Sequence, residues 1–430
     1  MLQKVLLAVL AASLPAIAFA DEISLDSVLE KAVESSRALK IAQLDVAISD
    51  ADVRVAKSDY LPTLKANLYL ERMFGLQKGP QTVTSVGGQV LPYGTRFQNS
   101  IGAQFNQTLW DFGVRKHKVL MKKRDAASKT AVVEQTLRDL KGKVIDSYAD
   151  ALKSYKMIQA DQEMLSLAQE SYQCKKRLYQ AGSITKVEMT EESITVAQTL
   201  DDIQTAKEQL AQQLEKLSYY TQEIYDIETL QMVDINTEAN DVRNFDLAKT
   251  PEARQFDHQI AEKGEEISYL KRQNLPQVSM YSYYNLYGVN QDSLGKSVSN
   301  LSQRTVSLGL NVSLPILDGL KSRASIQKAE LEKQKLVLQK ADTLEQLNVQ
   351  AKIYQEQMSN FGVQLETKAR ILKRTQYKGE LVSRLSDQQL VDKTKKLEAD
   401  IDEIKKQLES EKIVIQSLVA LKKRRLLEEG

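Results

Sequence analysis

The sequence contains the same arrangement of motifs twice. Tyr60-Leu61-Pro62 ends a stretch with helical spacing and precedes a stretch in which apolar and polar residues alternate, and Asn274-Leu275-Pro276 does the same in the second half. Leu109-Trp110-Asp111-Phe112-Gly113 then leads into a very long charged stretch, and Ile316-Leu317-Asp318-Gly319 leads into another. Internal repetition of this kind governs the whole fold. A chain that repeats paired strands and very long helices is expected to form part of a tubular assembly.

The composition favours long solvated helices over a large globular core. Only 7 Pro and 17 Gly occur in 430 residues, and charged residues make up 27 % against 6 % aromatic residues. The remainder is rich in Ala, Leu, Glu, Lys and Gln, which are good helix formers. The formal net charge of +2 gives no indication of a nucleic-acid partner. The basic run Lys422-Lys423-Arg424-Arg425 is interpreted as a solvated helix end.

Residues 1–20 are expected to be a secretory signal peptide. Lys4 precedes an apolar run from Val5 to Phe19, and Ala18-Phe19-Ala20 supplies the small residues needed for cleavage before Asp21. The run is too short for a membrane anchor. Cys174 is the only cysteine, so the chain has no intrachain disulfide, and an inert structural thiol is the favoured interpretation.

Each half is predicted to contain a helix followed by two strands. Residues 24–60 have helical spacing after a Ser24 cap, and Pro62 ends the helix. The period then changes from 3.6 to 2, which is typical of strands with one apolar face. The residues of these apolar faces are Leu64, Ala66, Leu68, Leu70, Ile101, Ala103, Phe105, Val278, Met280, Tyr284, Leu286, Val306, Leu308, Leu310, Val312 and Leu314.

Long helical hairpins account for most of the chain. A heptad seam runs from Gly113 to about Gln180, a length of roughly 100 Å, turns at Ala181-Gly182-Ser183 and returns in a partner helix. The second half is expected to run from Leu320 to about Tyr377, to turn at Lys378-Gly379, and to return from Leu381 to about Leu427. These elements predict a first structural repeat at 21–225, a linker at 226–250 and a second repeat at 251–430.

The strands are expected to face lipid. The apolar stripe of the long helices is narrow and already used by the heptad seam, so it offers no layer on which the strands can pack. A membrane accepts strands only in closed barrels, and four strands are too few to close one. The chain is therefore expected to form a homotrimer with a twelve-stranded barrel. Aromatic residues near the strands, expected to form interfacial girdles, are Tyr69, Phe74, Tyr93, Phe97, Trp110, Tyr281, Tyr283 and Tyr287. A soluble sandwich with ordinary surface tyrosines is the alternative.

The order and duplication of these elements resemble those of the TolC-like outer membrane efflux proteins, over essentially the whole mature chain. The residues that carry the resemblance are Tyr60-Leu61-Pro62, Leu317-Asp318-Gly319 and the turns Gly182-Ser183-Ile184-Thr185-Lys186-Val187-Glu188 and Gly379-Glu380-Leu381-Val382-Ser383-Arg384-Leu385. The resemblance implies a mainly α fold with a β portion, in which a trimeric twelve-stranded barrel in the outer membrane continues into an α-helical coiled-coil tunnel in the periplasm. It also implies passive conduction to the exterior from a periplasmic adaptor (membrane fusion) protein and an inner-membrane pump of the RND, ABC or MFS type, in efflux or in type I secretion.

The resemblance also suggests which residues form the periplasmic constriction or dock the adaptor. Acidic residues after the hairpin glycine line that constriction in the family, and Glu188 and Glu191 follow Gly182 in the first repeat. A ring of like carboxylates favours cations. The second repeat departs from the pattern, because Ser386 and Gln389 stand where family aspartates are expected and Asp387 is displaced by one. Arg384 is the expected basic partner of Glu188, and Gly379 the expected second turn glycine. The simpler interpretation is that all of these are solvated residues near a turn.

No catalytic, cofactor or metal site is expected. His117 and His258 are the only histidines and neither has a metal-ligand spacing around it, while Gly87-Gly88 lacks the Lys-Ser/Thr of a phosphate-binding loop. The alternative to a channel is a periplasmic or surface coiled-coil protein such as an adhesin stalk. A stalk needs no lipid-facing strands, so fractionation distinguishes the two. The sequence does not name the transported substrate.

Overall fold

The structure, a computed structural model, describes residues 22–74, 84–86, 89–91, 96–236, 246–290, 292–388 and 390–429. The expected signal peptide lies outside the described residues, as do Gly87-Gly88, Tyr93, Gln389 and part of the 226–250 linker. The chain divides into two units. The strand unit comprises residues 43–131 and 254–341, and the hairpin unit comprises residues 1–42, 132–253 and 342–430.

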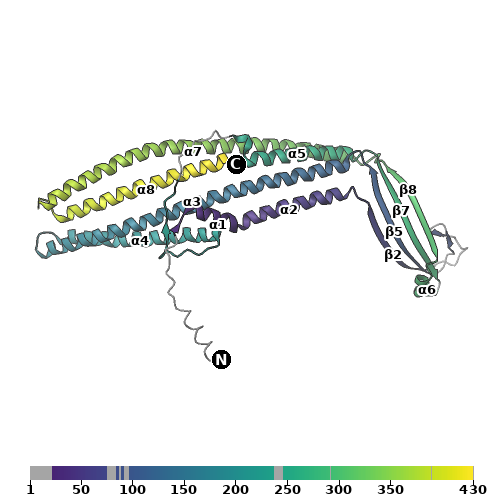
Figure 1. The fold of residues 1–430 in the computed structure, drawn as a ribbon, viewed down its shortest axis with the longest axis horizontal. Coiled ribbons are helices and arrows are strands. Elements are labelled where there is room, and N and C mark those ends of the chain that lie inside the picture. Colours follow the sequence, from purple (N-terminus) through teal and green to yellow (C-terminus); the bar gives the residue numbers. More distant parts are fainter. Residues whose placement is uncertain are drawn as a thin grey trace, which may run out of the picture. The chain divides into compact units, whose positions relative to one another are not determined.

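The strand unit contains a four-stranded antiparallel sheet, in which β2 (Thr63–Met73), β5 (Arg96–Trp110), β7 (Gln277–Asn290) and β8 (Gln303–Ser313) lie side by side in that order (Figure 1). Each of the four predicted strands is confirmed. The central pair, β5 and β7, joins the two halves of the sequence. The short strands β3 (Thr84–Val86) and β4 (Gln89–Leu91) pair separately, and the short helix α6 (Leu294–Ser299) lies between β7 and β8 in the chain.

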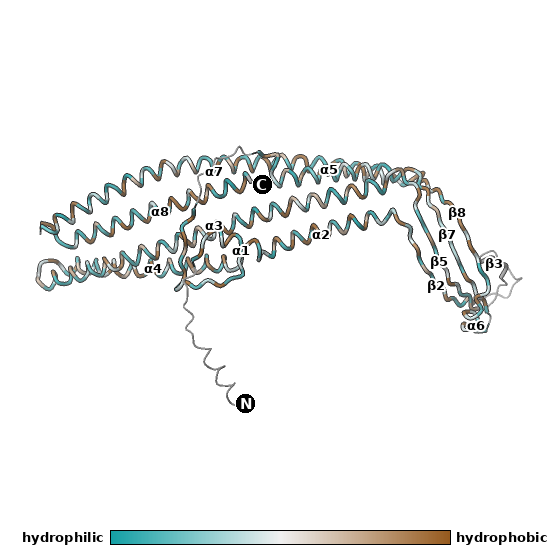
Figure 2. Tube along the Cα trace, viewed as in Figure 1, coloured by the Kyte–Doolittle hydropathy of each residue, from teal (hydrophilic) through white to brown (hydrophobic). Residues whose placement is uncertain are grey.

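The register gives the sheet an apolar face and a polar face. Leu68 lies opposite Ile101, Ile101 opposite Leu286, and Tyr284 opposite Val306, so the apolar residues of all four strands point to one side. This apolar face comprises Leu64, Ala66, Leu68, Leu70, Ile101, Ala103, Phe105, Met280, Tyr284, Leu286, Val306, Leu308, Leu310 and Val312. The polar face comprises Lys65, Asn67, Tyr69, Glu71, Ser100, Gly102, Gln104, Asn106, Ser279, Tyr281, Tyr283, Asn285, Thr305, Ser307, Gly309 and Asn311. The alternation can be followed along the trace in Figure 2.

The expectation that the aromatic residues form interfacial girdles is wrong for the four tyrosines of that set that the structure describes. The register places Tyr69, Tyr281, Tyr283 and Tyr287 on the polar face. The exposed leucines and valines lie on the other side of the sheet. Composition near the strands could not reveal this, because one step along a strand changes the face on which a residue lies.

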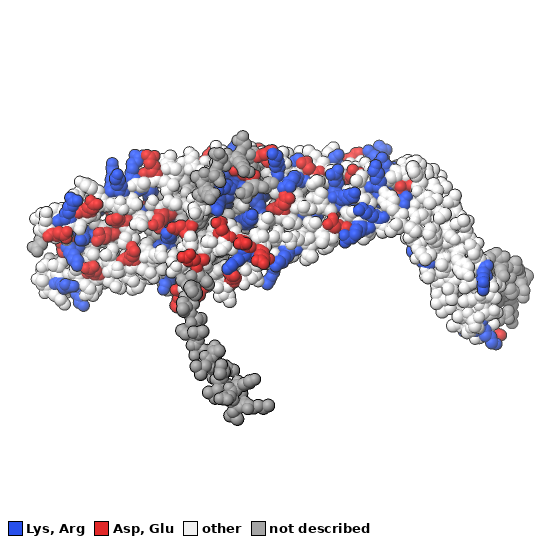
Figure 3. Space-filling model, in the orientation of Figure 1, with Lys and Arg blue, Asp and Glu red and all other residues white. Residues whose placement is uncertain are grey.

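The sheet connects to helices α2 (Arg37–Ser58), α3 (Val114–Gln180), α5 (Pro251–Arg272) and α7 (Lys321–Asp387). Helices α3 and α7 are each 67 residues long and begin at Val114 and Lys321. We call the number of positions from Val114 to Lys321 the repeat offset, because it relates equivalent positions in the two halves of the chain. Within the strand unit, Lys122 of α3 pairs with Asp52 of α2, and Lys263 of α5 pairs with Glu332 of α7. Charged side chains are dense over the helices and sparse over the sheet in Figure 3.

The hairpin unit contains α1 (Leu25–Ser35), most of α3 and α7, and their partner helices α4 (Lys186–Thr221) and α8 (Lys393–Glu429). The heptad seam of the first hairpin is largely confirmed. Its buried residues recur at steps of three, four or seven positions and include Leu140, Val144, Tyr148, Ala151, Ile203, Leu210, Leu214 and Leu217. Leu200 of the expected seam is half exposed. Such burial stabilises each large aliphatic side chain by roughly 1.5–3 kcal/mol.

A short parallel pair, β1 (Glu22–Ile23) and β6 (Gln231–Met232), packs beside this core, and a 3-10 turn η1 (Leu247–Lys249) precedes α5. The Tyr148 hydroxyl lies 2.8 Å from the carbonyl oxygen of Ile23 and 2.6 Å from that of Val233. Its single hydrogen is shared between two segments that are distant in sequence. Burial raises the pKa of Tyr148, and the nearby charges of Asp234 and Asp26 raise it further. The Tyr148 side chain therefore attaches the segments at Ile23 and Val233 to α3.

Two predictions about helix boundaries are wrong. The helix expected over 24–60 is broken at Ser36, where the backbone leaves the helical region at ψ 115° and a second helix begins at Arg37. The expected turn at Lys378-Gly379 does not exist, because α7 continues to Asp387. No helix in the described part of the chain has the length and apolar composition needed to cross a membrane.

Candidate functional site

The apolar face of the sheet is exposed to solvent in the single chain. The exposed fraction is 75 % for Leu64, 73 % for Val306 and Leu308, and 66 % for Leu310. A continuous apolar surface of this kind marks an interaction site with another protein or with a membrane. Because it extends over all four strands, and the opposite face is polar, its chemistry fits acyl chains on one side and water on the other.

The two edges of the sheet have no partner strand among the described residues of this chain. The strand order places β2 at one edge and β8 at the other, so each edge presents a row of backbone groups without partners in the sheet. Both edge strands are 11 residues long. Open edges beside an exposed apolar face indicate that the sheet is completed by further strands.

The polar face is packed by its larger side chains. A Cβ atom on Gly309 would lie 2.4 Å from the Tyr281 ring, so only glycine leaves room for this ring on β8. Tyr281 and Tyr283 have their ring centres 5.3 Å apart, and Gln104 donates a hydrogen bond of 3.2 Å to the Tyr283 hydroxyl. The tyrosines therefore form an ordered layer on the hydrophilic side of the sheet.

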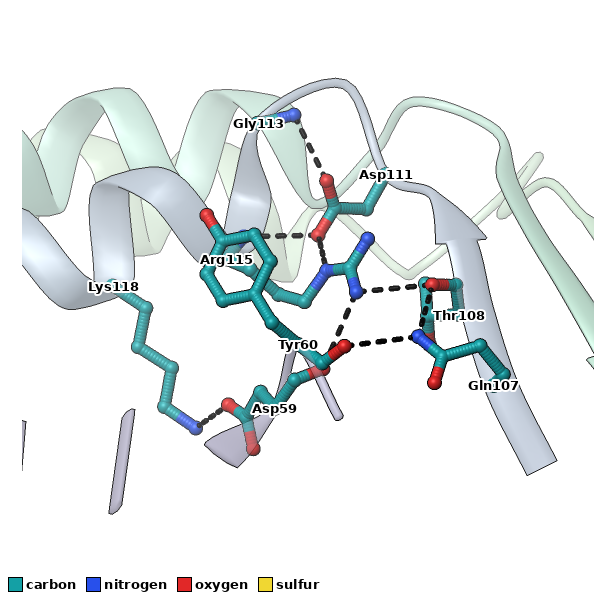
Figure 4. Close-up of polar contacts among 8 residues, drawn as sticks. All are labelled: Asp59, Tyr60, Gln107, Thr108, Asp111, Gly113, Arg115 and Lys118. Atoms are coloured by element: carbon teal, nitrogen blue, oxygen red, sulfur yellow. Dashed lines mark hydrogen bonds and ion pairs between the residues drawn. The ribbon is translucent and has the colours of Figure 1, made fainter. Parts of the chain in front are cut away.

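A hydrogen-bonded junction fixes the passage from β5 into α3 (Figure 4). Phe112 and Gly113 both have positive φ, at 52° and 90°, and Asp111 accepts hydrogen bonds from the backbone of Gly113 and from the backbone and side chain of Arg115. Burial acts to raise the pKa of Asp111, but the hydrogen bonds from Arg115 and Gly113 outweigh it and the pKa is lowered. The Asp111 carboxylate thus caps α3 and holds Arg115.

Arg115 also ties this junction to the start of β2. Its Nη1 donates to the carbonyl oxygens of Thr108, at 3.0 Å, and Asp59, at 3.3 Å, and its guanidinium lies 4.8 Å from the centre of the Tyr60 ring. The segments around Tyr60-Leu61-Pro62 and Asp111-Phe112-Gly113, which are distant in the sequence, are therefore held together by Arg115. The second junction is simpler, because Ser322 stands at the repeat offset from Arg115 and bonds to Asp318 and to Asn274.

The first hairpin turn has the structure expected from its sequence. Gly182 has φ +75°, and the Ser183 N–H donates to the carbonyl oxygen of Leu178 at 2.9 Å, which closes the end of α3. Thr185 begins α4 through a capping box with Glu188. The hydrogen bonds from Thr185 lower the pKa of Glu188, whose side chain is fully exposed. Glu191 is exposed one turn further along α4.

The second hairpin turn lies further along the chain than expected. The Leu390 N–H donates to the Leu385 carbonyl oxygen at 2.9 Å, which repeats the Ser183–Leu178 bond at the repeat offset. Asp392 then takes the place of Thr185 and accepts a hydrogen bond from the Thr394 hydroxyl. Gly379 is a buried helical residue of α7, where an added Cβ would lie 3.5 Å from Glu403 of α8. Sequence reasoning took Gly379 for a turn signal, but it serves helix packing.

The predicted site residues are therefore distributed over both turns. Glu188 contacts Thr185, while Arg384 and Asp387 are exposed in the last turn of α7. No ion pair joins Glu188 to Arg384 within the described part of this one chain. At the repeat offset, the counterpart of Glu188 is Lys395. Each turn also exposes one aliphatic side chain, Val187 at 66 % and Leu390 at 68 %.

Ion pairs connect the two hairpins along the contact between α3 and α8. Glu170 of α3 pairs with Lys393 of α8 at 2.5 Å, and Asp146 of α3 pairs with Lys423 of α8 at 2.6 Å. One ion pair therefore lies near each end of this contact. Lys175 lies between Glu192 of α4 and Glu398 of α8, at 2.7 and 3.6 Å. Sequence reasoning missed the partners on α8, because this helix belongs to the other half of the chain.

His117 lies beside an acidic side chain. His117 of α3 lies 2.6 Å from a carboxylate oxygen of Glu265 on α5, a partner that the sequence pattern did not reveal. The described residues contain no group of three or more His, Cys, Asp or Glu side chains able to hold a metal ion.

Comparison with known proteins agrees with this architecture. The model of the outer membrane efflux protein family matches residues 28–221. No curated protein matches the sequence significantly. The fold is similar to that of the CmeC outer membrane channel of Campylobacter jejuni, at 15 % identity and a TM-score of 0.76, covering 94 % of this chain and 85 % of that chain.

Two further solved structures have the same fold. The outer membrane protein VceC of Vibrio cholerae is 14 % identical, with a TM-score of 0.76 and coverage of 94 % of this chain and 96 % of that chain. The channel-forming protein CusC is 16 % identical, with a TM-score of 0.76 and coverage of 94 % and 92 %. Residues 28–221 thus match the outer membrane efflux protein family, and the fold of the chain is that of the solved TolC-like outer membrane channels.

Proposed function

We propose that three copies of this chain form an outer membrane channel that passively conducts substrates to the exterior. The observation that carries the proposal is the four-stranded sheet with two open edges and one exposed apolar face. Three such sheets joined edge to edge supply twelve strands in a closed barrel, which removes the open edges and places the apolar face against lipid.

The edges are suited to join each other. Full-length antiparallel pairing of β2 with β8 of a neighbouring copy places Leu64 opposite Val312, Leu68 opposite Leu308 and Leu70 opposite Val306. A slip of one residue would bring the apolar face of one copy against the polar face of the next, so the pairing is strongly specified. Two adjoining helices also expose apolar stripes, with Leu44, Ile48 and Val55 on α2 and Leu331 and Leu338 on α7.

The long hairpins form the periplasmic part in this proposal. They enclose an α-helical coiled-coil tunnel, and their ends at 178–192 and 376–392 form the constriction and the docking surface for a periplasmic adaptor. The adaptor connects the channel to an inner-membrane pump of the RND, ABC or MFS type, for efflux or type I secretion. The exposed Val187 and Leu390 side chains supply apolar contacts for an adaptor, and Glu188, Glu191, Arg384 and Asp387 supply charge at the aperture.

The proposal retains the repeat boundaries expected from the sequence, 21–225 and 251–430 with a linker at 226–250. The equal lengths of α3 and α7, and the recurrence of the same backbone hydrogen bond at both turns, support a duplication.

To test this proposal, the mature protein is purified from the outer membrane after a high-salt wash. Its mass is then measured in detergent, and its conductance is measured in planar bilayers. A detergent-stable trimer with discrete conductance steps is the expected result. A water-soluble protein that leaves the membrane in salt and passes no current would show that the chain is a coiled-coil stalk instead.

A further inference from the structure

The apolar face of the sheet carries two arginines at the end far from the long helices. Arg72 is the second-last residue of β2, and Arg304 is the second residue of β8. The register places both on the apolar face, because Arg72 lies opposite Phe97 and Arg304 lies opposite Leu286. Among the described residues of this face they are the only charged ones. A guanidinium at such a position needs an anionic or interfacial partner.

Neither arginine has an acidic partner among the described residues of its own chain. Both side chains are exposed, and no ion pair in the described part of the chain involves either of them. Arg72 instead lies between two aromatic rings, 4.7 Å from the centre of Phe74 and 5.1 Å from that of Phe97. Stacking of this kind holds the guanidinium plane in place while leaving its N–H groups free to bind a further group.

The proposed trimer brings the two arginines together, and the present inference rests on that proposal. In the full-length pairing of β2 with β8 of the next copy, Arg72 lies directly opposite Arg304. A slip of two residues, which also keeps the apolar faces together, leaves them diagonal neighbours within reach of long side chains. Like charges at such positions are destabilising unless an anion lies between them.

We infer that Arg72 and Arg304 of the neighbouring copy together bind a phosphate of a phosphorylated glycolipid in the outer leaflet. Two planar guanidinium groups match the oxygens of a phosphate, and the apolar residues below them accommodate its acyl chains. The end of the barrel far from the connections of the strands to α2, α3, α5 and α7 faces the exterior in the proposed arrangement. The anionic lipid of that leaflet is a glycolipid whose phosphates lie just above the acyl chains.

Helix α6 lies at the same end of the sheet and bounds the apolar band. Ser297 is fully buried and accepts a hydrogen bond of 2.7 Å from Asn99, a polar residue of β5 on the apolar side. The Ser297 hydroxyl also donates to the Gly288 carbonyl oxygen at 2.9 Å. Lys296 is exposed on α6, together with Leu294 and Val298. A cation between two apolar side chains is typical of a helix at the boundary between acyl chains and head groups.

The test uses the purified full-length mature trimer in nanodiscs of phosphatidylethanolamine. Separate samples contain diphosphorylated lipid A, dephosphorylated lipid A or phosphatidylglycerol, and native mass spectrometry counts the lipids that remain bound. The variants are Arg72→Gln and Arg304→Gln. The matched control is Lys65→Gln, which removes a cation from the polar face of the same strand.

Wild-type protein and Lys65→Gln are expected to retain diphosphorylated lipid A in preference to the other two lipids. Each arginine variant is expected to weaken that retention about tenfold or more, as for the loss of a hydrogen bond to a charged group. Equal retention by the arginine variants, or equal binding of dephosphorylated lipid A, would overturn the inference. Equal binding of phosphatidylglycerol would overturn its assignment to a glycolipid. Mass and conductance in phosphatidylethanolamine alone report separately on the proposed channel.

Discussion

Asp161 shows how one buried charge affects the stability of the hairpin unit. It is 4 % exposed on α3, and its Oδ2 atom has no hydrogen-bond partner in the described structure. Burial raises the pKa of Asp161, the charge of Asp202 raises it further, and Lys412 and Lys405 oppose the shift. Because the folded pKa lies above the unfolded one, the ionised carboxylate reduces stability at neutral pH. This loss disappears as the pH falls through the folded pKa.

Replacing Asp161 by Asn is therefore expected to raise the thermal unfolding midpoint at pH 7. It is also expected to reduce the change in midpoint between pH 7 and pH 4, since the variant carries no titrating group there. Circular dichroism of the detergent-solubilised protein measures both. Asp150→Asn is the control, because Asp150 is exposed on the same helix and forms a surface ion pair with Lys153; it should change both quantities much less than Asp161→Asn does. A lower midpoint for Asp161→Asn at pH 7 would contradict the argument.

Glu188 has a structural contact that must be separated from its proposed role at the aperture. The hydrogen bonds from Thr185 lower its pKa, so the side chain is ionised at neutral pH and also caps α4. We expect Glu188→Gln to weaken block of the channel by a trivalent cation about tenfold, because three charges are lost from the ring. Single-channel conductance in planar bilayers measures this.

Thr185→Ala is the matched control, since it removes the cap partner and keeps the charge. It should reduce helix stability by about 1 kcal/mol and leave the cation block intact. If both variants changed the block equally, capping rather than charge would be responsible. Unchanged block in Glu188→Gln would remove this residue from the aperture.

At the scale of elements, position 182 requires a glycine for its backbone conformation, whereas position 379 can accept an alanine. Gly182 ends α3 with φ +75°, a conformation that costs an L-residue about 1–2 kcal/mol. Gly379 is helical and buried in α7, and an added Cβ meets Glu403 at an ordinary contact distance of 3.5 Å. The same substitution therefore distinguishes a turn from a helix interior.

Gly182→Ala is expected to destabilise the first hairpin by about 1 kcal/mol or more, whereas Gly379→Ala is expected to stabilise the second by roughly 0.5–1 kcal/mol. Hydrogen exchange of the backbone amides near each glycine measures the local change. Faster exchange around residue 379 in Gly379→Ala would indicate that a turn lies there after all.

At the scale of the whole molecule, the exposed stripe on α2 is proposed to contact α7 of a neighbouring copy. Leu44 is 62 % exposed in the single chain, and Ile48 is 61 % exposed one turn further on. Burying a charge at such a contact costs several kcal/mol. Leu44→Glu is thus expected to shift the protein from trimer to monomer in detergent.

The control is Gln43→Glu, which places the same charge at an exposed position off the stripe. Analytical ultracentrifugation should find a trimer for Gln43→Glu and mainly monomer for Leu44→Glu. A trimer of wild-type stability in Leu44→Glu would mean that the α2 stripe is not an interface.

Residue pattern alone predicted the four strands, their apolar and polar alternation, the long α3 and the turn at Gly182. These features depend on local periodicity and on glycine at positive φ, which a sequence displays directly. The same reasoning misplaced the second turn. The described residues there, Gln388, Leu390 and Val391, include no Gly or Pro, while the nearby Gly379 imitates a turn signal. The separation between the two Asp motifs, at Asp111 and Asp318, would have located the turn correctly.

The sequence by itself determined the kinds of elements, their order and their duplication, because helix and strand periods arise from neighbouring residues. Only the tertiary structure decided which strands form the open edges and that Arg115 joins the Asp111 motif to Tyr60. It also placed Tyr69, Tyr281, Tyr283 and Tyr287 on the polar face. It also decided that Gly379 packs inside a helix and that the buried Oδ2 atom of Asp161 has no hydrogen-bond partner among the described residues. Each of these depends on contacts between segments far apart in the chain, whose geometry no local pattern specifies.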